Sequence, residues 1–244
     1  MNLKFDTDVK NGTNILDVVI PSQLEKYCST GMAFIDDAFG GKGMTPSTVI
    51  MLTGTPGAGK TTLMMQLADS LSRKGHLSIF NTAEESLFQV RRVAKRLRLK
   101  KGFMCGSERM VPDIIKNTDE LRKKYPKKQA FIIVDSLQTI DDGKYGNGNT
   151  NSMSQVRALE ALTQYAKETY AIVIVIGQVT KSGDLAGKQT LKHIVDAHCH
   201  LFVDLDRKSD TYGERCFEVK KNRFGCAGIS YVLSMGERGF REAF

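Results

Sequence analysis

The sequence has no long apolar run and no leader-like amino terminus. No uninterrupted apolar stretch approaches the roughly 20 residues that a membrane-spanning helix needs. The first residues, Met1 to Asp6, lack the basic-then-apolar layout of a secretory signal peptide. We therefore expect a cytosolic protein that has no membrane as a partner.

Paired cysteines are also missing. The cysteines at positions 28, 105, 199, 216 and 226 form no C-x-x-C pair, which excludes a zinc ribbon and argues against a disulfide framework. Cys199 stands between His198 and His200, a pattern that can bind metal. We favour a buried sulfur on a strand at the sheet edge, because the other ligands of a zinc site are missing.

Charge of one sign is in modest excess. Lys and Arg number 35 and Asp and Glu 27, so the net charge is +8, which permits nucleic-acid binding without proving it. The 244 residues, of which 41% are hydrophobic, are enough for one large domain with a sizeable core.

A phosphate-binding pattern lies in the first quarter of the chain. The run from Gly54 to Thr61 fits G-x-x-x-x-G-K-[ST] at every position, between an apolar run at 49–52 and a helix-like run at 63–68. An ordinary glycine-rich turn is the alternative, and this strand–turn–helix setting argues against it. The residues expected to bind ATP are Gly54, Thr55, Pro56, Gly57, Ala58, Gly59, Lys60, Thr61 and Thr62.

The chemistry of this motif assigns roles to its last residues. Lys60 is expected to reach the terminal phosphates, and the hydroxyl of Thr61 is expected to bind Mg²⁺. Asp135 ends an apolar strand that we place beside the phosphate-loop strand, where its carboxylate can hold the same Mg²⁺. A merely polar strand end is the alternative for Asp135.

Three further polar residues follow strands at the same edge. Glu84 and Glu85 come after the second strand, and one of them can polarise the attacking water. Gln178 follows the last parallel strand and can bind the γ-phosphate, or it can simply satisfy backbone groups.

The rhythm of apolar runs predicts an α/β fold. Strands and helices alternate up to Gly177, which indicates a mostly parallel sheet, and only strands follow, which indicates an antiparallel β extension. Strands are expected at 49–52, 77–80, near 103, at 130–135, 171–177, 201–205, 214–220 and 229–235. Helices are expected near 34–39 and at 62–74, 87–97, 112–125 and 153–170.

Local sequence patterns predict three further features, which concern the amino-terminal arm, a helix cap and a buried helix face. Residues 1–28 read as an amino-terminal arm with a short strand at 15–20, which covers the domain or docks on a neighbouring subunit. Ser29 or Thr30 is expected to cap the helix near 34–39. The helix at 87–97 is expected to bury the face that carries Leu87, Val90, Ala94 and Leu97.

Several runs, in order, resemble the RecA-like ATPases and, more narrowly, the ATPase core of the bacterial RadA (Sms) family. They are N-T-A-E-E-S at 81–86, D-S-L-Q-T at 135–139, G-Q-V-T-K at 177–181, L-A-G at 185–187 with L-K-H-I-V-D at 191–196, and K-N-R-F-G at 221–225. The resemblance covers residues 29–244, which we expect to form one RecA-like ATPase core, and it favours Glu84 over Glu85 as the base.

The resemblance implies an oligomeric motor of the RecA/DnaB superfamily that binds single-stranded DNA and promotes branch migration. A hexameric ring is expected, and a filament is the alternative. Lys221 and Arg223 match positions that act across the subunit interface, near the neighbour's nucleotide; without the resemblance they read as a solvated basic turn. A recombinase or a replication protein is a further expected partner.

Two polar loops, 141–152 and 180–192, match the DNA-facing loops of the family in position. Lys181, Lys188 and Lys192 in the second loop are expected to contact DNA phosphates. Tyr145 is the loops' only aromatic residue, so the resemblance implies a grip on the DNA backbone rather than base stacking.

The sequence also departs from the family pattern. It shows neither the four-cysteine zinc ribbon nor the Lon-protease-like domain, Lys188 replaces a proline, and Val93 replaces an arginine. We expect a stripped core, acting in the bacterial cytosol or in a virus-infected host cell.

The function expected is a DNA-dependent ATPase acting in recombination, repair or replication. The alternative is an ATP-gated mediator or assembly protein that hydrolyses slowly and does not translocate. A small-molecule kinase needs an acceptor pocket and an arginine-rich lid, and the family-matching loops argue against it.

Overall fold

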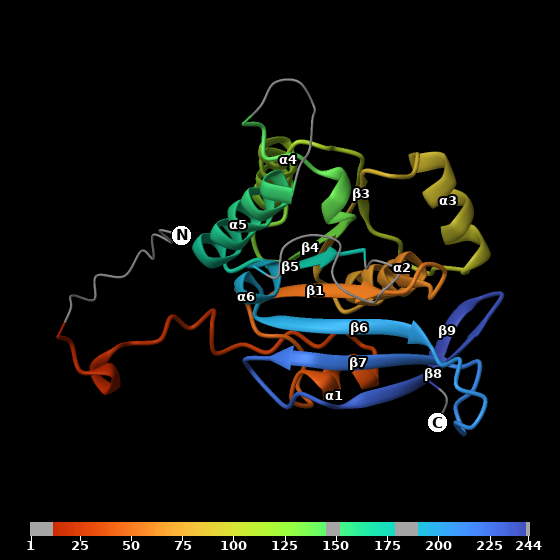
Figure 1. Ribbon diagram of the computed structural model, residues 1–244. Helices are drawn as coiled ribbons and strands as arrows, with labels where there is room; N and C mark the ends of the chain where they lie inside the picture. Colours follow the sequence, from red (N-terminus) through yellow and green to blue (C-terminus); the bar gives the residue numbers. More distant parts are fainter. Residues whose placement is uncertain (1–11, 145–151, 179–189, 243–244) are drawn as a thin grey trace.

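The computed structural model describes residues 12–144, 152–178 and 190–242. They form one nine-stranded sheet with helices on both faces (Figure 1). The strand order is β3-β2-β4-β5-β1-β6-β7-β8-β9, and the strands from β3 to β6 in this order are parallel. The remaining pairs, from β6 to β9, are antiparallel. The expected α/β fold with a C-terminal antiparallel extension is therefore confirmed.

The strands lie close to their predicted positions, with one exception. They are β1 Val49–Gly54, β2 Leu77–Thr82, β3 Met104–Gly106, β4 Ala130–Asp135, β5 Ile172–Ile176, β6 Ala197–Val203, β7 Arg215–Asn222, β8 Ser230–Gly236 and β9 Gly239–Glu242. The strand expected at 201–205 in the antiparallel extension begins four residues earlier, as β6, and pairs parallel with β1. The sequence analysis did not predict β9, whose four residues pair with the end of β8. A run this short carries little alternation of its own, so its pairing partner decides its conformation.

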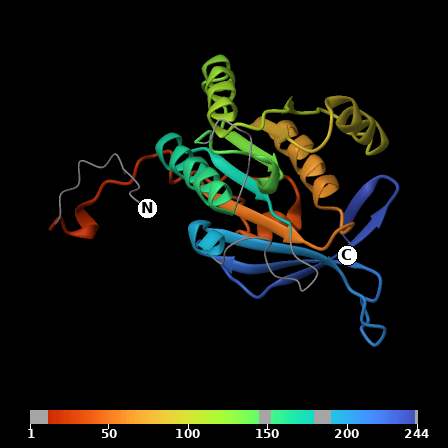
Figure 2. The same ribbon diagram turned by 45° about the horizontal axis from the view of Figure 1, so that its top comes forward.

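The longer helices also match the prediction to within two residues. The helices are α1 Ala33–Ala38, α2 Lys60–Arg73, α3 Leu87–Arg96, α4 Val111–Lys124, α5 Ser152–Thr169 and α6 Thr190–Ile194, with short 3-10 turns at Ile15–Asp17 and Leu137–Thr139. In Figure 2, helices α4 and α5 are seen apart from helices α2 and α3.

Two hydrophobic cores, one on each face, hold the parallel strands. Ile50 and Leu52 of β1 face the core that α1, α2 and α3 cover, whereas Val49 and Met51 face the core that α4, α5 and α6 cover. Every residue of β1, β2, β4 and β5 is buried. This double burial explains why these strands read as unbroken apolar runs rather than as alternating ones.

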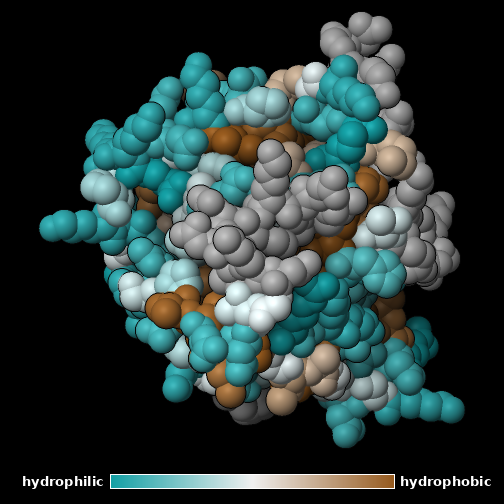
Figure 3. All heavy atoms as spheres, turned by 90° about the vertical axis from the view of Figure 1, so that its left-hand side faces the viewer, coloured by the Kyte–Doolittle hydropathy of each residue, from teal (hydrophilic) through white to brown (hydrophobic). Residues whose placement is uncertain are grey.

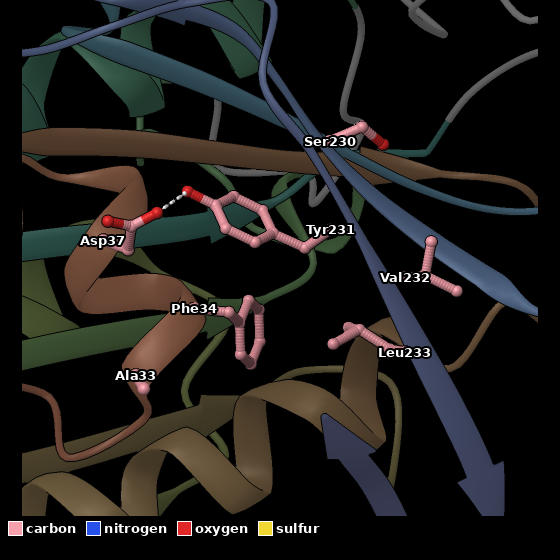
Figure 4. A pocket seen from close by; sticks show the side chains of 7 residues that line it. All are labelled: Ala33, Phe34, Asp37, Ser230, Tyr231, Val232 and Leu233. Carbon is pink, nitrogen blue, oxygen red and sulfur yellow. Dashed lines mark hydrogen bonds between the residues drawn. The ribbon is translucent and has the colours of Figure 1, made fainter. Parts of the chain in front are cut away.

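Helix α1 packs on the antiparallel extension. The rings of Phe34 and Phe217 lie 5.4 Å apart at 79°, and the hydroxyl of Tyr231 donates to Asp37 Oδ2 at 2.7 Å. Figure 4 shows Phe34, Asp37 and Tyr231 turned toward one another between the helix and β8. A pocket of about 390 Å³ opens beside them. The extension is thus part of the same packed body as the parallel sheet.

The predicted strand at 15–20 is wrong. Residues Ile15–Asp17 form a 3-10 turn, which Asn14 caps by accepting a hydrogen bond from the Leu16 N–H at 3.1 Å. Leu16 and Val19 are 89% and 88% exposed, on an arm that runs away from the sheet (Figure 1). Since none of the described residues pairs with this segment, its apolar composition alone does not make it a strand.

The predicted cap of the first helix is wrong, and the predicted buried face of α3 is right except at Leu87. Met32 precedes α1 without a side-chain cap, and Thr30 instead binds Asp36 through both its N–H and its hydroxyl, each at 2.7 Å. Val90 and Leu97 are buried as predicted and Ala94 packs against the core, whereas Leu87 is 45% exposed. A capping box at Ser86 fixes the start of α3.

None of the described helices is both long and apolar enough to cross a membrane.

Candidate nucleotide site

The phosphate loop lies where β1 ends and α2 begins, at the carboxyl edge of the parallel strands. The residues around it enclose a pocket of about 240 Å³. The pocket is lined by Gly54, Pro56, Lys60, Thr61, Glu84, Asp135, Ser136, Ile176 and Gln178. These residues come from four parallel strands and the loops after them, so the sheet brings together side chains from distant parts of the sequence.

Two glycines of the loop are required by its backbone. Gly59 precedes α2 with φ 102°, a conformation that disfavours any side chain. A Cβ at Gly54 would lie 2.0 Å from the carbonyl oxygen of Leu201, so the neighbouring strand leaves no room there. The chain can therefore turn tightly and present the amino-terminal N–H groups of α2, which bind anions readily.

Lys60 is held inside the loop. Its Nζ donates to the carbonyl oxygens of Gly54 at 2.8 Å and Thr55 at 3.1 Å. Burial lowers the pKa of Lys60, and the carboxylates of Asp135 and Glu84 oppose this shift. An ammonium group that is held only by backbone carbonyls can exchange them for phosphate oxygens.

Thr61 and Asp135 meet although 74 positions separate them. The Thr61 hydroxyl donates to Asp135 Oδ2 at 2.6 Å. Burial and the nearby Glu84 and Glu85 raise the pKa of Asp135 to about 6, against the Thr61 hydrogen bond and the Lys60 charge. A hydroxyl and one carboxylate fit Mg²⁺, which keeps several waters and takes its other oxygens from substrate phosphates. Bound there, the ion would neutralise phosphate charge.

Glu84 faces the pocket and Glu85 does not line it. The Oε1 of Glu84 accepts hydrogen bonds from the Ser136 hydroxyl at 2.5 Å and from Gln178 Nε2 at 3.1 Å. Gln178 is in turn fixed by its backbone N–H, which donates to Gln138 Oε1 at 3.2 Å. The sequence analysis missed the contacts of Ser136 and Gln138, although both stand within three positions of Asp135.

Lys221 and Arg223 lie away from this pocket. Asn222, between them, pairs with Ala197 at the start of β6, whereas Gly54 at the phosphate loop pairs with Leu201. Four strand residues correspond to about 13 Å along the sheet, and two strand spacings add to this distance. The structure therefore separates Lys221 and Arg223 from their own chain's phosphate loop.

Arg223 is anchored but accessible. Its side chain is 54% exposed, and Nη1 lies 3.2 Å from Oδ1 of the buried Asp196. The other oxygen of Asp196 accepts from the Val49 N–H at 2.9 Å and from Lys167 Nζ at 2.8 Å. Lys221 Nζ donates to the carbonyls of Lys192 and Val195 at 2.9 and 2.6 Å. The two cations are therefore positioned by the edge at which β1 and β6 begin.

The predicted DNA-binding lysines fall in two groups. Lys181 and Lys188 lie outside the described residues. Lys192 belongs to α6 rather than to a loop, which corrects the predicted loop boundary. The apolar side chains of Leu191 and Ile194 are buried in the core beneath α6.

The sequence analysis expected residues 198–200 at a sheet edge, and this prediction is wrong, because β6 lies between β1 and β7. The Cys199 sulfur is buried, as expected. His198 Nε2 and His200 Nδ1 lie 2.8 and 2.9 Å from the hydroxyl of Thr53, and burial lowers the pKa of His198 to about 4. No group of three metal-binding side chains occurs among the described residues.

Known proteins resemble this chain in sequence. A family model described as "AAA domain" matches residues 41–184, which is more than half of the chain. DNA repair protein RadA of Haemophilus influenzae is 36% identical over 216 residues, and RadA of Escherichia coli is 34% identical over 216 residues. Each match covers 88% of this chain and 44% of the relative, so the chain spans less than half the length of these relatives.

Solved structures share the fold. The ATPase domain of G40P superposes with a TM-score of 0.78 at 16% identity, over 91% of this chain and 93% of that domain. A DnaB-like replicative helicase superposes with a TM-score of 0.76 at 16% identity, over 88% of this chain and 61% of that protein. The matched family model shows that the chain belongs to the AAA-domain family. Its sequence resembles the RadA proteins, and its fold is that of the G40P and DnaB-like ATPase domains.

Proposed function

We propose that this protein is a DNA-dependent ATPase of the RadA type, which binds single-stranded DNA and acts as an oligomer in recombination, repair or replication. The observation that carries the proposal is the pocket in which Lys60, Thr61, Asp135 and Glu84 converge. The names of the relatives, DNA repair proteins, support the biological setting.

The pocket supplies the parts that hydrolysis of ATP needs. Lys60 binds the terminal phosphates in place of the backbone carbonyls, and Thr61 with Asp135 holds Mg²⁺. Glu84 orients the attacking water and accepts its proton, while the Gln178 amide holds Glu84 in place. When the γ-phosphate leaves, Gln178 transmits the change to the loop that carries Lys181 and Lys188.

The arginine function is supplied between subunits. Arg223 is half exposed and far from its own phosphate loop, which suits a cation that enters the neighbouring chain's site. An arginine acting in trans stabilises the charge of the transition state only when the interface closes. Hydrolysis is thereby coupled to assembly, in a ring or a filament, and Lys221 acts beside Arg223.

The deciding experiment measures ATP hydrolysis with and without single-stranded DNA, on wild type and on Arg223→Ala. We expect DNA to accelerate turnover and Arg223→Ala to abolish the acceleration while ATP binding persists. Lys208→Ala, a change of equal charge on an exposed loop, serves as the control.

Two results would contradict the proposal. If single-stranded DNA does not change the rate of ATP hydrolysis, and Arg223→Ala hydrolyses ATP at the wild-type rate, the protein would instead be an ATP-gated assembly factor. ATP binding without hydrolysis under any condition would remove the motor and leave only a nucleotide-dependent mediator.

A further inference from the structure

A second and larger pocket lies at the opposite edge of the sheet, where the parallel strands begin. Its volume is about 750 Å³. Its walls come from the chain before α1, the end of α2, the α4–β4 turn and the end of α5. Figure 3 views the molecule from this side and shows that hydrophilic side chains predominate on it.

The lining of this basic pocket has one sign of charge. Its cationic residues are Lys26, Lys74, Arg122, Lys127 and Lys128, and none of the described residues that line it is acidic. His76 also lines the pocket, and burial lowers its pKa, so that it is neutral near pH 7. Five positive charges from three separate segments therefore line one open cavity.

Helix stabilisation accounts for only part of this charge. Basic side chains favour helix carboxyl ends, and Arg122 and Lys74 stand at the ends of α4 and α2. Arg122 also has structural partners, because its guanidinium donates to the Thr169 carbonyl at 2.9 Å and lies 3.5 Å from Asp119. Lys26, Lys127 and Lys128 lie outside any helix and are exposed, so a helix dipole does not explain them.

The shape and the aromatic residues favour an extended, flexible anion. The cavity is larger than the 240 Å³ nucleotide pocket and is open to solvent on one side. Tyr27 and Tyr170 line it, and Tyr27 is 55% exposed. Cations that track a backbone, together with an aromatic face on which a base can stack, are the features of surfaces that bind single strands. An acidic peptide would use the cations but not the aromatic face.

We infer that the basic pocket is a second binding site for single-stranded nucleic acid, on the edge opposite the phosphate loop. It binds the sugar–phosphate backbone through Lys26, Lys127 and Lys128, without reading sequence. The inference rests on the proposed DNA-dependent function and extends it, because it gives DNA a contact outside the predicted loops.

The test measures binding of an oligothymidylate by fluorescence anisotropy at several salt concentrations. The variant is Lys127→Ala with Lys128→Ala, and the matched control is Arg207→Ala with Lys208→Ala in the β6–β7 connection at the other edge of the sheet. Removing two phosphate contacts should reduce the slope of log K against log salt by about 1.4, since each contact contributes roughly 0.7 on single strands. Affinity should fall about 25-fold near 0.1 M salt, which is the same 1.4 logarithmic units taken relative to 1 M salt.

The control variant should bind the oligothymidylate as wild type does, and the pocket variant should hydrolyse ATP at the wild-type rate in the absence of DNA. In the wild-type protein, bound DNA should protect Lys127 and Lys128 from acetylation. If the oligothymidylate binds wild type and the pocket variant with equal slopes, this inference is overturned while the proposed function stands. If wild type binds no DNA, both fall. Binding of polyglutamate but not of the oligothymidylate to the pocket would assign it to an acidic protein segment and overturn the inference.

Discussion

The two edges of the sheet, where the parallel strands end and where they begin, gather different sets of polar side chains. At the carboxyl edge, the loops after β1, β2, β4 and β5 close one pocket that holds Lys60, Thr61, Glu84 and Asp135 within a single chain. At the opposite edge, Arg223 and Lys221 are anchored by Asp196 and by backbone carbonyls, and they face no nucleotide site of their own chain.

This difference follows from topology. Parallel strands all place their carboxyl ends at one edge, so residues far apart in sequence converge there. The antiparallel strand β7 runs the other way and carries its own end, Asn222, back to the start of β6. The chain therefore gathers Lys60, Thr61, Glu84 and Asp135 at one edge of the sheet and leaves Arg223 at the other edge.

The largest effect is expected from Glu84→Gln, which tests the carboxyl edge. Because the amide cannot accept the proton of the attacking water, hydrolysis should fall about 10²- to 10⁴-fold. Binding of ATP, measured by calorimetry, should stay close to that of wild type. Glu85→Gln is the matched control and should retain turnover. Retained turnover in Glu84→Gln would move the base elsewhere.

A mixing experiment tests whether the two edges meet between chains. Glu84→Gln and Arg223→Ala should each lack DNA-stimulated hydrolysis when tested alone. In an equal mixture, roughly a quarter of head-to-tail interfaces join an intact Glu84 to an intact Arg223. DNA-stimulated hydrolysis should recover to about that share. A mixture as inactive as its components would show that both residues serve the same chain.

The seam between β1 and β6 should weaken in acid. His198 has a pKa of about 4 against an ordinary value of 6.5, so the unfolded chain binds the proton first as the pH falls. The free energy of unfolding should therefore drop between pH 7 and pH 4, by about 3 kcal/mol from this group.

Denaturant unfolding of wild type and His198→Gln at several pH values measures this effect. Asp135, whose pKa is raised to about 6, changes the free energy of unfolding in the opposite direction between pH 7 and pH 4. The informative quantity is therefore the difference in unfolding free energy between wild type and His198→Gln at each pH. His200, Lys192, Lys220 and Lys221 surround His198 and remain in both. An identical pH dependence of both proteins would contradict the assignment.

The smallest effect is expected where α1 joins the antiparallel extension. Tyr231→Phe removes the hydroxyl that donates to Asp37 Oδ2 and leaves the ring packing on Phe34. The free energy of unfolding should decrease by about 1 kcal/mol. ATP hydrolysis should not change, because the carboxyl edge is untouched; a large loss of hydrolysis would mean that the two regions are coupled through α1.

Sequence patterns predicted the parallel half better than the rest. Runs such as Ile132 to Val134 are buried on both faces and read as strands without any knowledge of their neighbours. Amphipathic helices α4 and α5 were predicted within one residue of their ends. In contrast, the apolar run at 15–20 is exposed, and Leu87 is 45% exposed. Apolar composition predicts burial only when a partner surface exists, and the local sequence does not show that partner.

The sequence by itself determined the phosphate loop, because its tight turn, its lysine and its hydroxyl lie within eight consecutive residues and need only local backbone geometry. It also predicted that the sheet is mostly parallel, because its central strands are unbroken apolar runs, as expected of strands that are buried on both faces. Only the tertiary structure decided which of Glu84 and Glu85 faces the pocket, how Asp196 holds Arg223, and that Lys26 and Lys128 share a pocket. Those outcomes depend on strand order and on the direction of β7. These bring together residues more than a hundred positions apart, beyond the reach of any local pattern.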